Sequence, residues 1–109
     1  MPVNEFGVKL DMNRYAPSIL DTEPGLCFGC FHQTDTARHE IFFGNGRRAK
    51  SKRLGLWVNL CPRCHTIAHN EYKYDRYLKQ TAQEAAMYIY GWDIEKCIDE
   101  LGKNYLEEE

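Results

Sequence analysis

Apolar residues recur at a helical spacing in the last third of the chain. Over residues 72–90 they fall close to a 3.6-residue period, which is typical of an amphipathic helix ending at Gly91. The periodic positions are Tyr74, Tyr77, Leu78, Thr81, Ala85 and Ile89. A further helix is predicted over residues 92–101, ending at Gly102. Its apolar face is expected to consist of Ile94, Cys97, Ile98 and Leu101.

The middle of the chain shows the pattern of two strands followed by a short helix. Residues 36–43 and 54–60 are predicted as strands, and the first is followed by Gly44-Asn45-Gly46, a turn signal. The basic stretch 47–53 between them is interpreted as a loop. Pro62 suits the first turn of a helix, so residues 62–70 are predicted as a helix that begins inside the second cysteine pair.

The length of 109 residues indicates one domain with a modest apolar core. Prolines and a glycine interrupt residues 1–25, which are expected to form an irregular N-terminal arm. The domain is expected to span residues 26–106, and residues 107–109 to be an acidic tail. These elements predict a small α+β fold.

Charge is distributed unevenly along the chain, although the net charge is only -2. The segment 37–65 holds seven of the 14 basic residues and one of the 16 acidic residues, Glu40. Such a segment either binds a polyanion or is an ordinary solvated face. The residues expected to contact nucleic acid are Arg38, Arg47, Arg48, Lys50, Lys52 and Arg53.

Four of the five cysteines form two Cys-x-x-Cys pairs, Cys27 with Cys30 and Cys61 with Cys64. No signal peptide or apolar span of about 18 residues is evident, so a soluble protein in a reducing cytoplasm, not associated with a membrane, is expected. In that setting two such pairs indicate a tetrahedral zinc site. A thioredoxin-like redox pair is the alternative. Cys97, on the inner face of a predicted helix, is interpreted as a buried apolar residue.

Three histidines are spaced to form a second site. His65 and His69 are four residues apart, so a helix projects both rings from one face. His39 lies on the first predicted strand beside Glu40. Because the second cysteine pair must fold back against that strand, these four side chains are expected to lie together. Two histidines at this spacing also occur by chance, but the zinc-anchored helix favours a metal site.

The chain resembles the HNH (ββα-metal) nucleases with a four-cysteine zinc framework. The resemblance runs from about Cys27 to Leu106 and is closest to small phage and prophage proteins. It rests on the two cysteine pairs, His39-Glu40-Ile41-Phe42, the block Cys61-x-x-Cys64-His65-x-x-x-His69, and Gly102-Lys103-Asn104-Tyr105-Leu106. The family's asparagine position holds Leu56, and Asn59 is offset from it by three residues.

The resemblance implies a zinc-stapled ββα-metal motif followed by C-terminal helices. It further implies that His39, His65 and His69 hold a catalytic divalent ion (Mg, Mn, Ni or Zn) and that Glu40 is the general base. A glutamate at this position can also act as a metal ligand. The activity implied is hydrolysis of phosphodiester bonds, with DNA as the expected substrate. The alternative is a non-cleaving zinc module that binds nucleic acid or a host or phage protein.

Overall fold

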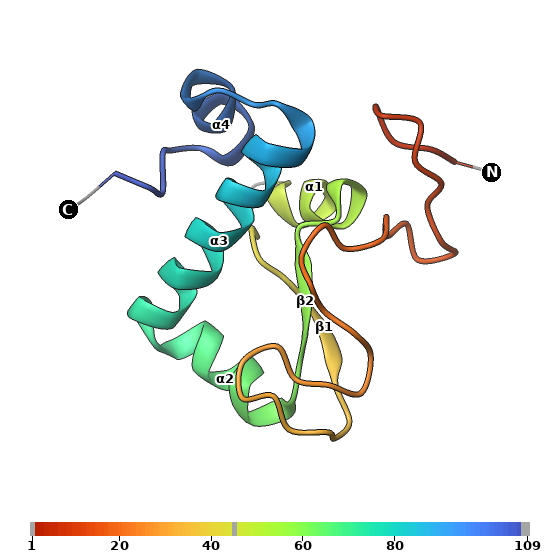
Figure 1. The fold of residues 1–109 in the computed structure, drawn as a ribbon, viewed down its shortest axis with the longest axis vertical. Helices are drawn as coiled ribbons and strands as arrows, with labels where there is room; N and C mark the ends of the chain where they lie inside the picture. The colour runs from red at the N-terminus through yellow and green to blue at the C-terminus, as the bar shows by residue number, and fades with distance from the viewer. Residues whose placement is uncertain (1, 45, 108–109) are drawn as a thin grey trace.

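Two short antiparallel strands and four helices form the regular structure of residues 2–44 and 46–107, which the computed structural model describes. The predicted turn residue Asn45 and the tail residues Glu108 and Glu109 lie outside the described residues. The fold is a small α+β domain (Figure 1). Its elements are β1 (Ala37–Glu40), α1 (Arg47–Leu54), β2 (Trp57–Leu60), α2 (Pro62–Asn70), α3 (Tyr72–Tyr90) and α4 (Ile94–Leu101).

Strands β1 and β2 pair so that His39 lies opposite Val58 and Glu40 opposite Trp57. The strand predicted over 36–43 is shorter in the structure, because the backbone of Phe42 leaves the ladder. The Ser51 hydroxyl accepts from the Phe42 N–H at 2.9 Å and donates to its carbonyl at 2.7 Å. This side chain thereby ends β1 and joins it to α1.

The prediction of a loop over residues 47–53 is wrong, because Arg47–Leu54 form helix α1. Arginine, alanine and lysine all favour helices, and Lys52 and Arg53 in the last turn complement the negative end of the helix dipole. Gly55 ends the helix at φ 73° and donates its N–H to the carbonyls of Lys52 and Ser51. Strand β2 consequently begins at Trp57, three residues later than predicted.

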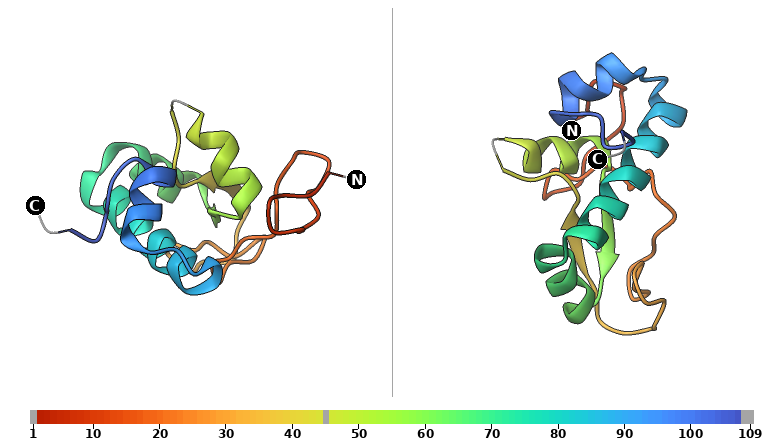
Figure 2. Two further views of the ribbon diagram at one scale, coloured as in Figure 1. Left: turned by 90° about the horizontal axis from the view of Figure 1, so that it is seen from above. Right: turned by 90° about the vertical axis from the view of Figure 1, so that its left-hand side faces the viewer.

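The N-terminal segment, residues 2–25, covers the outer edge of β2. Three groups in or next to β2 contact it: Ile19 N–H donates to Gly55 O, the Ser18 hydroxyl to Trp57 O, and Asn59 N–H to the Thr22 hydroxyl. An uncovered strand edge would be open to pairing with another chain. Helix α3 runs along the other side of the sheet (Figures 1 and 2).

Helices α2 and α3 have the predicted bounds. Helix α4 begins two residues later than predicted, because the Asp93 side chain accepts from the Lys96 N–H and caps it. The predicted apolar faces are only partly buried: Leu78, Cys97 and Leu101 point inward. The exposed members of those faces are Tyr77, Ile89, Ile94 and Ile98.

The core lies between the sheet and the helices, and it includes the expected buried Cys97. Its fully buried aliphatic side chains come from β2, from α1, α3 and α4, and from residues next to the two strands, namely Ile41, Leu54, Leu56, Val58, Leu60, Leu78 and Leu101. In the described part of the chain, no helix combines the length and apolar character needed to cross a bilayer.

Candidate metal centres

The four cysteines of the two Cys-x-x-Cys pairs converge at one end of the sheet. Cys27 and Cys30 belong to the loop before β1, and Cys61 is the N-cap of α2, with Cys64 in its first turn. Figure 1 shows this loop lying beside the start of α2. The four sulfur atoms all lie within 4.8 Å of one another.

Backbone N–H groups stabilise the thiolate form of one cysteine in this cluster. The Cys27 sulfur accepts N–H groups from Gly29, Cys30 and Cys61 at 3.3 to 3.5 Å. Burial opposes ionisation, but these donors lower the pKa of Cys27 to about 6. Burial and the neighbouring sulfurs instead raise the pKa of Cys64.

The spacing of the sulfurs fits zinc. A tetrahedral ion with zinc–sulfur bonds of about 2.3 Å requires sulfur–sulfur edges of about 3.8 Å. The Cys30 and Cys61 sulfurs are 3.9 Å apart. Four thiolates complete the tetrahedron and leave no open position, so this cluster is positioned to hold a structural ion and not a reacting one.

The three histidines form a separate cluster between β1 and α2. The ring of His39 is 5.0 Å from that of His65 and 5.1 Å from that of His69, and the latter two are 4.9 Å apart. One nitrogen from each ring lies within 4.8 Å of the others. The structure thus brings together all three predicted ligands. This agrees with the prediction from the place of His39 on a strand and from the four-residue spacing of His65 and His69.

The surroundings of His39 and His65 favour their neutral imidazole form, which is the form that binds metal. Burial, together with the charges of His65 and His69, lowers the pKa of His39 to about 3. Burial also lowers the pKa of His65. His39 Nε2 is buried without a hydrogen-bond partner, so its lone pair or proton is unsatisfied. His69 is exposed, so an ion held here would keep a solvent-facing position.

Glu40 does not join the histidine ligands. Its carboxylate accepts from Arg48 at 2.7 Å and from the Tyr15 hydroxyl at 3.1 Å. Neither group of potential ligands found among residues 2–44 and 46–107 contains it. Its charge nevertheless reaches the cluster, because it raises the pKa of His65 against the effect of burial. This geometry places Glu40 near the histidine cluster but outside its set of potential ligands.

Four of the six predicted nucleic-acid contacts are paired with carboxylates from other segments of the chain. Arg38 pairs with Asp11 at 2.9 Å, Arg48 with Glu40 at 2.7 Å, Lys50 with Glu100 at 3.5 Å and Arg53 with Glu5 at 2.8 Å. Lys52 lies over the Tyr15 ring at 4.8 Å. Arg47 lies against Gly102, with its Nε buried and unpartnered. The basic cluster is therefore more nearly neutral than the sequence indicates.

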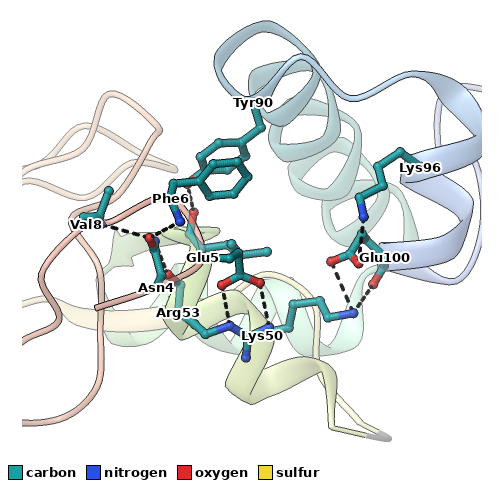
Figure 3. Close-up of polar contacts among 10 residues, drawn as sticks. Asn4, Glu5, Phe6, Val8, Lys50, Arg53, Tyr90, Lys96 and Glu100 are labelled. Carbon is teal, nitrogen blue, oxygen red and sulfur yellow. Dashed lines mark hydrogen bonds and ion pairs between the residues drawn. The ribbon is translucent and has the colours of Figure 1, made fainter. Parts of the chain in front are cut away.

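Figure 3 shows how the N-terminal segment reaches helix α1. The Glu5 carboxylate receives two hydrogen bonds from Arg53, which lower the pKa of Glu5. The Asn4 side chain donates to the Arg53 carbonyl, and Phe6 stacks on Tyr90 with ring centroids 4.2 Å apart. Acidic and aromatic groups thus cover part of the basic helix.

Three side chains near the two clusters were not anticipated. Tyr15 donates to Glu40, His32 Nδ1 lies 3.3 Å from the Cys30 sulfur, and the Tyr74 hydroxyl is buried beside the cysteines. The sequence holds a signal only for His32, which follows Cys30 by two residues. Tyr15 and Tyr74 lie in other segments, and only the fold brings them to these sites.

No protein-family model, curated protein or solved structure matches this chain. The chemistry of the two clusters therefore has to be inferred from their own side chains. Four thiolates form a closed set suited to a structural ion. Three imidazoles with an exposed side form an open set suited to a reacting one.

Proposed function

We propose that this chain is an HNH-type endonuclease of phage or prophage origin that hydrolyses phosphodiester bonds of nucleic acid, with DNA as its substrate. The observation that carries the proposal is the convergence of His39, His65 and His69 from a two-stranded sheet and the following helix. Two paired strands followed by a helix are what a ββα-metal motif requires, and in this chain helix α1 lies between the two strands. The same proposal assigns structural zinc to the four cysteines.

The residues have distinct roles in this proposal. His39, His65 and His69 would hold a divalent ion, which would supply Lewis acidity toward the phosphate and the leaving oxygen. A Glu40 carboxylate oxygen accepts the proton of the attacking water. Arg48 and Tyr15, which both donate to that carboxylate, hold it in place.

Substrate contacts in this proposal come mainly from helix α1. The Arg48 side chain is 58% exposed although it is ion-paired, so its guanidinium still faces solvent. Such cations bind backbone phosphates without reading bases, which predicts weak sequence specificity. Lys50 and Arg53 are paired with Glu100 and Glu5 in the free protein. When these two cations bind DNA phosphates, they would exchange the carboxylates for the phosphates.

Cleavage of supercoiled plasmid with added magnesium, manganese, nickel or zinc tests this proposal. Wild-type protein is expected to produce nicked and linear forms, and His65→Ala is expected to produce neither. Thr66→Ala, an exposed neighbour on α2, is the matched control and is expected to cleave normally. If wild-type protein leaves DNA and RNA of every form intact with every metal, the nuclease proposal fails.

A second candidate is a non-cleaving module that binds nucleic acid or a protein. The contacts of Glu40 favour it, because both oxygens of its carboxylate already accept hydrogen bonds, one from Arg48 and one from Tyr15. In that case the protein would retard DNA in a gel, without cleaving it, under all the metal conditions above.

A further inference from the structure

The Tyr74 hydroxyl is a buried polar group that lacks a partner. Tyr74 lies in the first turn of α3, and among the described residues no hydrogen-bond partner reaches its oxygen. A buried hydroxyl without a hydrogen-bond partner is destabilising, so such a group in a folded protein calls for an explanation. The neighbours of this oxygen supply one.

The hydroxyl lies against the cysteine cluster. A Cβ built on Gly29 would be 2.4 Å from the Tyr74 oxygen and 3.0 Å from the Cys64 sulfur. Both atoms therefore lie against the same side of Gly29, which is one of the two residues between Cys27 and Cys30. A side chain at residue 29 would separate the hydroxyl from the sulfur, whereas glycine lets them share this space.

A thiol and a thiolate make different demands on such a neighbour. A neutral Cys64 thiol is a weak acceptor, whereas a metal-bound thiolate is anionic and accepts hydrogen bonds. The backbone N–H of Cys64 donates to the Cys61 sulfur, and the backbone N–H of Gly29 donates to the Cys27 sulfur. None of the hydrogen bonds identified in the described residues gives the Cys64 sulfur an N–H donor. Burial raises the pKa of the Tyr74 phenol above its ordinary value near 10, so the hydroxyl remains protonated at neutral pH and can supply this donor.

We propose that Tyr74 is a positioning residue of the cysteine metal centre, whose hydroxyl donates a hydrogen bond to the metal-bound thiolate of Cys64. This contact links helix α3 to a ligand of the ion, in addition to the packing of α3 on α2. It gives the buried Tyr74 hydroxyl a hydrogen-bond acceptor, and it stabilises part of the negative charge on the four thiolates. The proposal is independent of nuclease activity.

The test uses the full chain loaded with Co²⁺ or Zn²⁺ in Tyr74→Phe, with Tyr77→Phe as the matched control. Tyr77 lies three residues further along α3, its ring stacks near that of Tyr74, and its side chain is 54% exposed. Removing a hydrogen bond from a thiolate raises the energy of its lone pairs. The sulfur-to-cobalt charge-transfer band is therefore expected to move to longer wavelength in Tyr74→Phe only.

Zinc transfer to a chelator gives a second readout. Tyr74→Phe is expected to lower zinc affinity about 10- to 100-fold, the usual effect of removing an outer-sphere hydrogen bond, and Tyr77→Phe to leave it unchanged. An unchanged cobalt spectrum with unchanged zinc affinity in Tyr74→Phe would overturn the proposal. So would equal changes in both variants, because these would indicate a general effect on α3.

Discussion

His39 and Glu40 are adjacent in β1, but their side chains have different partners. The His39 ring lies 5.0 Å from the ring of His65, whereas the Glu40 carboxylate accepts from Arg48 at 2.7 Å. Successive residues of a strand point to opposite faces, and the register places Glu40 opposite Trp57 and His39 opposite Val58. His39 is thus a candidate metal ligand, whereas the neighbouring Glu40 is a candidate base that lies outside the group of potential ligands.

This separation predicts that Glu40→Gln retains the metal of the histidine cluster. The proposed cleavage rate is expected to fall about 10² to 10⁴-fold, the usual contribution of a general base. Metal titration followed by plasmid cleavage measures both quantities. A loss of metal affinity that excess metal reverses would instead make Glu40 a ligand. Glu84→Gln, an exposed carboxylate on α3, is the control for charge.

The cysteine cluster is expected to hold about one zinc ion per chain. Structural zinc in small peptides contributes on the order of 10 to 16 kcal/mol, which exceeds the net stability of a domain of this size. Cys61→Ser should therefore unfold or aggregate the protein. Cys97→Ala, at a buried cysteine outside the cluster, should retain both zinc and fold. Metal analysis and circular dichroism check this, and a folded, zinc-free wild type would contradict it.

The cations of α1 are expected to dominate the salt dependence of DNA binding. Replacing Arg47, Arg48 and Lys50 together by Gln should reduce the slope of log affinity against log salt by up to about three. The control replaces Lys9, Arg14 and Lys73, three exposed cations outside α1, and makes the same change in net charge. Equal slopes for the two triple variants would place the nucleic acid elsewhere.

Glu5 is expected to compete with phosphate for Arg53. Because two hydrogen bonds tie its carboxylate to that guanidinium, Glu5→Gln should strengthen DNA binding and increase the salt slope by about one. Fluorescence anisotropy at several salt concentrations measures both changes. If Glu84→Gln strengthens binding equally, net charge and not the Arg53 contact is responsible.

Local signals in the sequence identify part of this structure well. Pro62 and Gly91 mark ends of α2 and α3 that the structure reproduces, and the spacing of His65 and His69 places two rings together. The sequence pattern does not predict helix α1, because only Ser51 and Leu54 of this helix are buried. A single apolar inward position gives no helical periodicity.

Contacts between distant segments account for the rest. Glu5 and Arg53 are 48 residues apart, and Tyr15 and Glu40 are 25 residues apart. No sequence periodicity relates such distant positions. A count of the basic residues in α1 is therefore higher than the number of unpaired cations that the structure leaves there. The Tyr74 hydroxyl is a similar case, since only the packing of α3 on α2 brings it to the cysteines.

Gly55 gives a stability prediction that separates backbone strain from steric conflict. It adopts φ 73° where α1 turns into β2, and a Cβ there would lie 2.3 Å from the Pro17 carbonyl oxygen. Gly25 has a similar φ of 82°, but a Cβ there would meet nothing within 4 Å. Gly25→Ala should therefore cost only the left-handed strain of about 1 to 2 kcal/mol.

Gly55→Ala should cost that strain and also a displacement of the N-terminal segment, because Pro17 O is a backbone atom that no rotamer change can move. The Ile19 N–H donates to the Gly55 carbonyl at 2.9 Å, so this displacement also breaks a hydrogen bond that covers the edge of β2. Denaturant unfolding of the zinc-loaded variants measures the difference. Equal losses of stability in the two variants would show that the segment yields freely at Pro17 and does not fix the junction between α1 and β2.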